Sequence, residues 1–298
     1  MAWFKKKPTD LERLAGLVDE VRETAIGRFA KHGLAARVQE GTSGLDTVLV
    51  VGDSRIYPLY YLTTHLMSGD LSDVEQYVSA HVDGLVDADN APDVRALSDA
   101  DWLELVRVRL VPEYVAHGVQ ARYAQQTVGE LVVVICVDYP THLSYVSDAA
   151  LGGRDPLALA ALGLASVMDE PVPPAVEIDP GIWLIDDESP YTATKALGMA
   201  SLVGGVLPAA PQGVLFGLPH RHALLAAPVG PEVVQTVKTM MSLIIGSAVD
   251  SAPGGPLSTS LYYWHEGDFE RVGFVADDGG VHIVAAGRFG EVLSSLGD

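Results

Sequence analysis

The chain has 298 residues, of which 48% are hydrophobic and 19% charged, and its formal net charge is -20. This hydrophobic content excludes an intrinsically disordered chain, and the 30 glycines and 18 prolines follow no collagen-like or low-complexity period. The acidic excess repels phosphate backbones and anionic lipid surfaces, so we expect no nucleic-acid binding. It either keeps a hydrophobic chain soluble or meets a basic partner protein.

Two segments with the pattern His-Gly-aliphatic-x-Ala-Arg, residues 32–37 and 117–122, lie 85 residues apart. Apolar residues spaced by three and four precede each segment, which predicts amphipathic helices that end there. We expect Gly33 and Gly118 to stop these helices in the left-handed conformation, with His32 and His117 facing the negative end of the helix dipole. The apolar positions are Leu11, Leu14, Leu17, Val18, Val21 and Ala25 in the first helix, and Trp102, Leu105, Val106, Leu110 and Tyr114 in the second.

The correspondence continues through a β-hairpin and a second helix. Residues 48–51 match 132–135, residues 60–62 match 144–146, and helices are predicted over 71–86 and 155–168. We therefore predict an N-terminal region 1–170 that contains a duplication of about 11–86 and 100–168. The single cysteine, Cys136, lies in an apolar run that reads as a buried strand, where a thiol behaves as a small hydrophobe.

A Pro-rich stretch at 171–180 is the predicted linker to a C-terminal region 181–298. In that region the sequence predicts strands and helices in an order that segregates hairpins from helices. The chain as a whole is therefore expected to be α+β, with largely antiparallel sheets built from repeated helix/β-hairpin/helix units. The predicted C-terminal elements are a strand at 181–185, a helix at 192–203, a hairpin of 214–217 and 223–227, a helix at 232–249, a hairpin of 261–264 and 271–275, and a strand at 281–285.

The most reactive-looking residues are His220, Arg221 and His222. Residues two apart on a strand share a face, so both imidazoles could reach one ion, with His265, Asp186 or Asp187 as a further ligand if the fold brings it near. A solvated hairpin tip is the alternative, as is an anionic group held by Arg221 between the imidazoles. The two aspartates could also simply complement the dipole of the helix that follows them.

Recognised catalytic motifs are missing: there is no phosphate-binding loop, no dinucleotide fingerprint, no His-Glu-x-x-His and no paired Cys-x-x-Cys. We therefore expect no catalytic residue, cofactor or metal. The leading hypothesis is a cytoplasmic binding or adaptor protein with an acidic surface, without a signal peptide or membrane span. The alternatives are a metal-dependent hydrolase that uses His220, His222, Asp186 and Asp187, and an immunity-type antagonist of a basic partner.

Residues 216–225 (FGLPHRHALL) and 256–264 (PLSTSLYYW) resemble the YtpQ-like family of bacterial proteins. An aliphatic strand, a Pro-x-Arg-[Asp/His] tip and a later Leu-Ser element recur in that family, and residues 131–146 are similar to its middle section. The resemblance covers about residues 30–275. It implies a mixed α+β fold and carries no established activity, and the two histidines around Arg221 depart from the family pattern.

Overall fold

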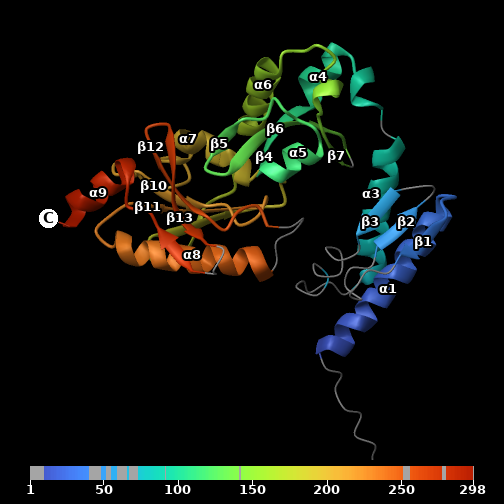
Figure 1. Cartoon of the computed structure of the whole chain (residues 1–298), viewed down its shortest axis with the longest axis horizontal. Coiled ribbons are helices and arrows are strands. Elements are labelled where there is room, and N and C mark those ends of the chain that lie inside the picture. The colour runs from blue at the N-terminus through green and yellow to red at the C-terminus, as the bar shows by residue number, and fades with distance from the viewer. Residues whose placement is uncertain are drawn as a thin grey trace, which may run out of the picture. The chain divides into compact units, whose positions relative to one another are not determined.

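The structure is a computed structural model that describes residues 10–39, 48–51, 55–58, 66, 73–90, 92–140, 142–250, 256–276 and 280–297 (Figure 1). The chain divides into two compact units. Unit 1 is Met1–Ala91 with Pro140–His142, and unit 2 is Pro92–Tyr139 with Leu143–Asp298. Each combines helices with antiparallel sheet, so the predicted α+β fold is confirmed.

The division between the units lies at residues 91 and 92, whereas the sequence placed it in the Pro-rich stretch at 171–180. That stretch lies inside unit 2, and part of it forms strand β8 (Val176–Asp179), which pairs with β9 (Ile182–Asp186). Proline lacks only the backbone donor, so prolines beside a short edge strand do not prevent it from pairing. The stretch is therefore not a linker between compact units.

Unit 1 packs two helices on one face of a three-stranded antiparallel sheet of order β1-β2-β3. Its core takes one side chain per helical turn from α1 and α3, because residues four apart share a helix face. Residues 60–62, one arm of the predicted hairpin, lie outside the described residues. The elements are α1 (Asp10–Lys31), β1 (Ala36–Gln39), β2 (Val48–Val51), β3 (Arg55–Pro58) and α3 (Val74–Asn90).

Helix α1 ends at Gly33 as the sequence predicts. Gly33 has a φ of 75°, and the N–H of Leu34 donates to the carbonyl of Phe29 over 3.0 Å. A left-handed glycine with this backbone bond is the Schellman end of a helix. His32 has a more specific role than dipole complementation, because its Nε2 lies 2.7 Å from a carboxylate oxygen of Asp83 in α3.

Asp83 ties the last turn of α1 to α3. Arg28 donates from Nε to its carboxylate over 2.6 Å, and the hydrogen bonds from Arg28 and His32 lower the pKa of Asp83 to about 2. A carboxylate with a depressed folded-state pKa contributes stability above its ordinary pKa and loses it as the pH falls through the folded value. Asp83→Asn should therefore lower the urea midpoint at pH 6 by an amount equivalent to about 1 kcal/mol or less, since the site is partly exposed.

The difference between wild type and Asp83→Asn should shrink as the pH falls from about 4 to about 2. Circular dichroism during urea unfolding at each pH measures it. A difference that stayed constant across this range would show that the Asp83 charge does not stabilise unit 1.

In unit 2, the helix predicted between Trp102 and Tyr114 is wrong. The segment forms α4 (Asp99–Leu105), β4 (Val106–Pro112) and α5 (Glu113–Gly118) in succession. The run Val-Arg-Val-Arg-Leu alternates with period two, and β-branched residues favour that extended form. The left-handed residue after α5 is Gln120, with a φ of 58°, and not Gly118.

Strand β4 belongs to a second antiparallel sheet, in which β6 is central. Strand β4 pairs along one edge of β6, and β5 and β7 pair along the other. Helix α6 packs against β4, and Asp155 caps it ahead of Pro156 as predicted. The duplication of 11–86 and 100–168 remains a prediction. The bounds are β5 (Gln126–Val128), β6 (Leu131–Asp138), β7 (Leu143–Tyr145) and α6 (Pro156–Asp169).

The largest sheet has the order β14-β13-β12-β10-β11-β9-β8 and is antiparallel throughout. Helix α8 (Val233–Asp250) lies on one face of this sheet, and η4 (Ala193–Gly198) with α7 (Met199–Leu202) lies on the other. Strand β10 (Val214–Gly217) is therefore buried along its whole length (Figure 1). The predicted helix at 192–203 is a 3₁₀ turn, η4, followed by the short α7. No helix among the described residues is long and apolar enough to cross a membrane.

The remaining bounds are η2 (Val94–Ala96), η3 (Asp148–Leu151), η4 (Ala193–Gly198), α7 (Met199–Leu202), β10 (Val214–Gly217), β11 (Ala223–Pro228), α8 (Val233–Asp250), β12 (Leu261–His265), β13 (Asp268–Val275), β14 (Val281–Ile283) and α9 (Gly287–Gly297).

Candidate functional site

The five candidate residues from the sequence lie together at one end of the largest sheet. His220, Arg221 and His222 form the tip between β10 and β11. Asp186 ends β9 opposite Ala223 of β11, and the N–H of Asp187 donates to the carbonyl of His222 over 3.2 Å. Antiparallel pairing of β9 with β11 therefore brings the two sequence clusters to the same place.

The expected strand geometry of the histidine pair is wrong. Strand β10 ends at Gly217 and β11 begins at Ala223, so residues 220 to 222 are in the turn and the alternation of a strand does not apply. The ring centroids of His220 and His222 are 6.2 Å apart, and the ring planes are inclined by 51°.

Both ring nitrogens of His222 are engaged. Arg221 donates from Nε to Nε2 of His222 over 2.8 Å, and Nδ1 lies 3.1 Å from the carbonyl oxygen of Ser189. A guanidinium can only donate, so Nε2 accepts and Nδ1 carries the proton that it donates to Ser189. Burial, reinforced by Arg221 and His220, lowers the pKa of His222. His222 is therefore a neutral imidazole with a fixed tautomer at neutral pH.

The two aspartates differ in their surroundings. Asp187 accepts a hydrogen bond from the backbone N–H of Ser189 and so closes the loop after β9. Asp186 is exposed at the end of the strand, yet partial desolvation, together with the charge of Asp187, raises the pKa of its carboxyl group. In the part of the chain that the structure describes, no group of three or more His, Cys, Asp or Glu side chains is placed to hold a metal ion.

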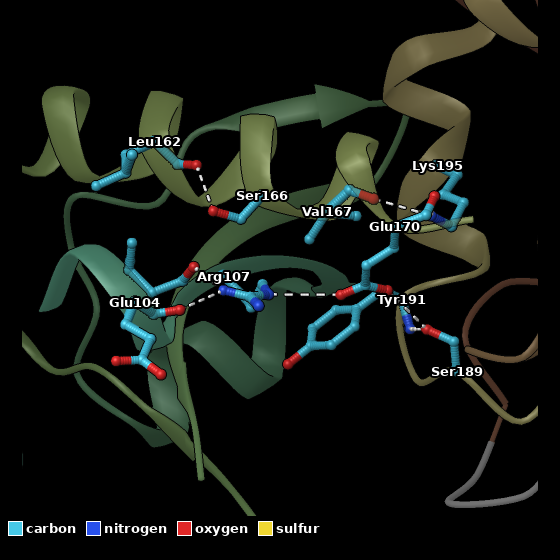
Figure 2. A network of polar contacts seen from close by, with 10 residues as sticks. Glu104, Arg107, Leu162, Ser166, Val167, Glu170, Ser189, Tyr191 and Lys195 are labelled. Carbon is cyan, nitrogen blue, oxygen red and sulfur yellow. Dashed lines mark hydrogen bonds and ion pairs between the residues drawn. The ribbon is translucent and has the colours of Figure 1, made fainter. Parts of the chain in front are cut away.

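A hydrogen-bond network anchors the loop after β9 to β4 and α6 (Figure 2). Glu170, just past the end of α6, accepts from Ser189 Oγ over 3.3 Å and faces Nε of Arg107 on β4 at 3.4 Å. Ser189 Oγ in turn accepts from the N–H of Tyr191 over 3.2 Å. The loop that carries Tyr191 is thus fixed by polar contacts from two other elements.

Lys195 is part of the same network and is almost completely buried. Its ammonium group donates to the carbonyls of Val167 and Glu170 over 2.8 and 3.0 Å, so it satisfies the last carbonyls of α6 (Figure 2). Burial lowers the pKa of Lys195, which Glu170 and Asp187 partly oppose. Lys195 therefore acts as a C-terminal cap of helix α6.

Next to this network, β4, β6 and β7 present a second group of side chains on one face. Arg109 is opposite Val134 in the β4–β6 ladder, and its guanidinium lies 5.6 Å from the ring centroid of Tyr145. Cys136 shares that face, and burial raises the pKa of its thiol to about 12. The thiol is therefore protonated and not a nucleophile at neutral pH.

Three buried polar atoms around His222 have no hydrogen-bond partner among the described residues: Arg109 Nε, Tyr191 Oη and His220 Nδ1. The Tyr191 hydroxyl lies beside Cys136 and Asp138 but forms no well-formed hydrogen bond with either. Arg109 contributes to the electrostatics of both Cys136 and His222, so these groups are neighbours. We name Arg109, Tyr191, His220, Arg221 and His222 the arginine–histidine cluster.

Sequence reasoning did not find Arg109 or Tyr191. Arg109 was assigned to a helix, although its period-two position between Val108 and Leu110 was a usable signal for a strand. Tyr191 follows Pro190 in a loop and carries no local signal.

Comparison with known proteins found no matching family model, no matching curated protein and no matching solved structure.

Proposed function

We propose that the protein is a cytoplasmic, non-catalytic binding protein and that its ligand binds at the arginine–histidine cluster. The supporting observation is a contrast between two kinds of polar group. His222 and Asp187, which acid–base or metal chemistry would need, are engaged in internal hydrogen bonds. Three other buried polar atoms beside them have no partner among the described residues, and such atoms are what a bound ligand satisfies.

A metal-dependent hydrolase built from His220, His222, Asp186 and Asp187 fits this geometry less well. A catalytic zinc site needs three protein ligands, each with a lone pair directed at the ion. The Nε2 lone pair of His222 is taken by Arg221, and its Nδ1 carries the proton donated to Ser189. Metal binding at Nε2 would therefore have to displace Arg221, whereas the Nδ1–H bond to Ser189 could remain.

Metal titration tests the proposal directly. Calorimetric titration of Zn²⁺ and Mn²⁺ into the full chain should show no stoichiometric binding, and the His220→Ala variant should behave identically. His117→Ala is the matched control, because His117 is a surface histidine, 75% exposed, that lies outside the arginine–histidine cluster. One metal ion per chain that is lost on His220→Ala but kept in His117→Ala would overturn the binding function in favour of the hydrolase.

The net charge of -20 supports a basic protein as the partner of the outer surface. Association of this kind weakens as salt screens the charges. Capture of one cationic protein at about 50 mM salt, lost at about 500 mM, is the expected result. An empty or salt-insensitive capture would contradict a basic partner.

A further inference from the structure

Arg109 and Lys195 are the most deeply buried charged side chains among the described residues, with 8% and 1% of their surface exposed. Their surroundings differ sharply. The Lys195 ammonium has two carbonyl acceptors, whereas the Arg109 side chain makes no hydrogen bond or ion pair with any described group and contacts only the ring of Tyr145 as a cation–π partner.

Burial of a cation without a partner is costly, and lysine can avoid the cost by losing its proton. Burial lowers the pKa of Lys195, which is the direction that favours loss of the proton. Arginine cannot follow, because its guanidinium stays charged at any physiological pH. The folded chain therefore holds a permanent positive charge at Arg109 that no internal group of the described chain compensates.

The surroundings of Arg109 suit a negatively charged ligand. Nε is its one nitrogen that is buried without a partner, so the two terminal nitrogens, which make no hydrogen bond either, reach the surface. Tyr191 offers an unpartnered hydroxyl donor, and both Tyr191 and Arg109 lie near Cys136. Arg221 adds a second guanidinium near Tyr145, and the Asp138 carboxylate lies beside Tyr191.

We propose that the arginine–histidine cluster binds an oxyanion, the carboxylate or phosphate group of a small ligand, with Arg109 as its main contact and the Tyr191 hydroxyl as a further donor. A guanidinium can bind two oxygens of either group at once. His220, whose Nδ1 has no partner among the described residues, is a further polar group of the cluster. This inference rests on the proposed function and adds the chemical class of the ligand.

Calorimetric titration of the full chain with inorganic phosphate and, separately, with acetate at low ionic strength tests the proposal. Saturable one-site binding of at least one anion is expected, and the anion that binds identifies the phosphate or the carboxylate source. Arg109→Met should weaken binding about tenfold or more, and Tyr191→Phe by a smaller factor. Arg122→Met is the matched control, because it removes the same charge from a side chain that is 92% exposed in the same unit and should leave binding unchanged.

Thermal unfolding in anion-free buffer separates a ligand role from a structural one. If Arg109 is kept for a ligand, Arg109→Met replaces an uncompensated buried cation with an apolar side chain and should raise the melting temperature by about 2 °C. A lower melting temperature would assign Arg109 to structure and overturn the proposal. Equal loss of binding in Arg122→Met, or no binding of either anion by wild type, would overturn it as well. Neither result touches the proposed function, which the metal titration decides.

Discussion

Glu130→Ala should lower the free energy of unfolding by about 2–3 kcal/mol, because it removes the acceptor that three buried hydroxyl groups share, although Ser258 Oγ and Tyr262 Oη, 2.7 Å apart, can still bond to each other. Oε1 of Glu130 accepts hydrogen bonds from Ser258 Oγ over 2.7 Å and from Ser260 Oγ and Tyr262 Oη over 2.8 Å each. The three hydroxyl residues are 6%, 3% and 0% exposed. The carboxylate therefore joins the turn between β5 and β6 to the end of β12 in the largest sheet.

Local backbone geometry makes this contact possible. Gly129, the residue before Glu130, has a φ of 54°, and a Cβ there would lie 2.6 Å from Cε1 of Tyr262. Only glycine lets the turn approach the tyrosine ring this closely. The close approach of this turn to Tyr262 brings the glutamate within reach of the hydroxyl groups.

The pH dependence of the same contact has a definite sign. Burial pushes the pKa of Glu130 upward, but the hydrogen bonds from Ser258, Ser260 and Tyr262 together outweigh it, so the net pKa lies below its ordinary value. The contribution to stability is present above the ordinary glutamate pKa and is lost as the pH falls through the lower folded value. Glu130→Gln, which keeps one acceptor oxygen without the charge, should approach wild type in stability as the pH falls below the ordinary glutamate pKa.

Urea unfolding of the full chain measures both effects. The matched control is Glu104→Ala, because Glu104 is exposed on α4 and its carboxylate accepts no hydrogen bond among the described residues. If Glu130→Ala cost no more than this control, the hydroxyl cluster would be a consequence of packing between the two sheets and would not hold them together.

Local patterns in the sequence predicted the parts of the fold that depend on neighbours along the chain. The hairpins β10–β11 and β12–β13 were found because two short apolar runs flank a polar turn. The segment from Trp102 to Tyr114 also satisfies a helical spacing of three and four with its large residues, and only the alternation from Val106 to Leu110 marks the strand. Pairing with β6 over seven residues decides between the two patterns.

The candidate site depends on contacts between residues distant along the chain. Asp186 and His222 were each noticed from the sequence, but the β9–β11 register that joins them was not predictable from either segment alone. Arg109 comes from a third element, β4. It is a candidate because its buried Nε has no hydrogen-bond partner among the described residues. Whether a side chain has a partner depends on how the folded chain packs, so residue spacing in the sequence cannot predict it.

Gly163→Ala is expected to lower the free energy of unfolding by about 2 kcal/mol, although alanine favours helix over glycine. Gly163 is buried in α6 where the helix crosses β4, and a Cβ there would lie 2.7 Å from the carbonyl carbon and 2.8 Å from the carbonyl oxygen of Arg107. Backbone atoms of a strand that is paired along its length cannot move aside as a flexible side chain can. The added methyl group must therefore push α6 away from the sheet.

Gly246→Ala in α8 is the matched control, because a Cβ at Gly246 meets nothing within 4 Å and the substitution should stabilise the chain by about 0.5–1 kcal/mol. Opposite signs for the same chemical change, measured by urea unfolding of the full chain, are the expected result. Two stabilising substitutions would mean that α6 can shift without cost.

Because Glu170 follows α6 and contacts Arg107 at 3.4 Å, a shifted helix should also disturb the anchoring of the loop that carries Tyr191. Gly163→Ala is therefore expected to weaken anion binding through displacement of the loop that carries Tyr191, whereas Gly246→Ala should leave the binding affinity unchanged.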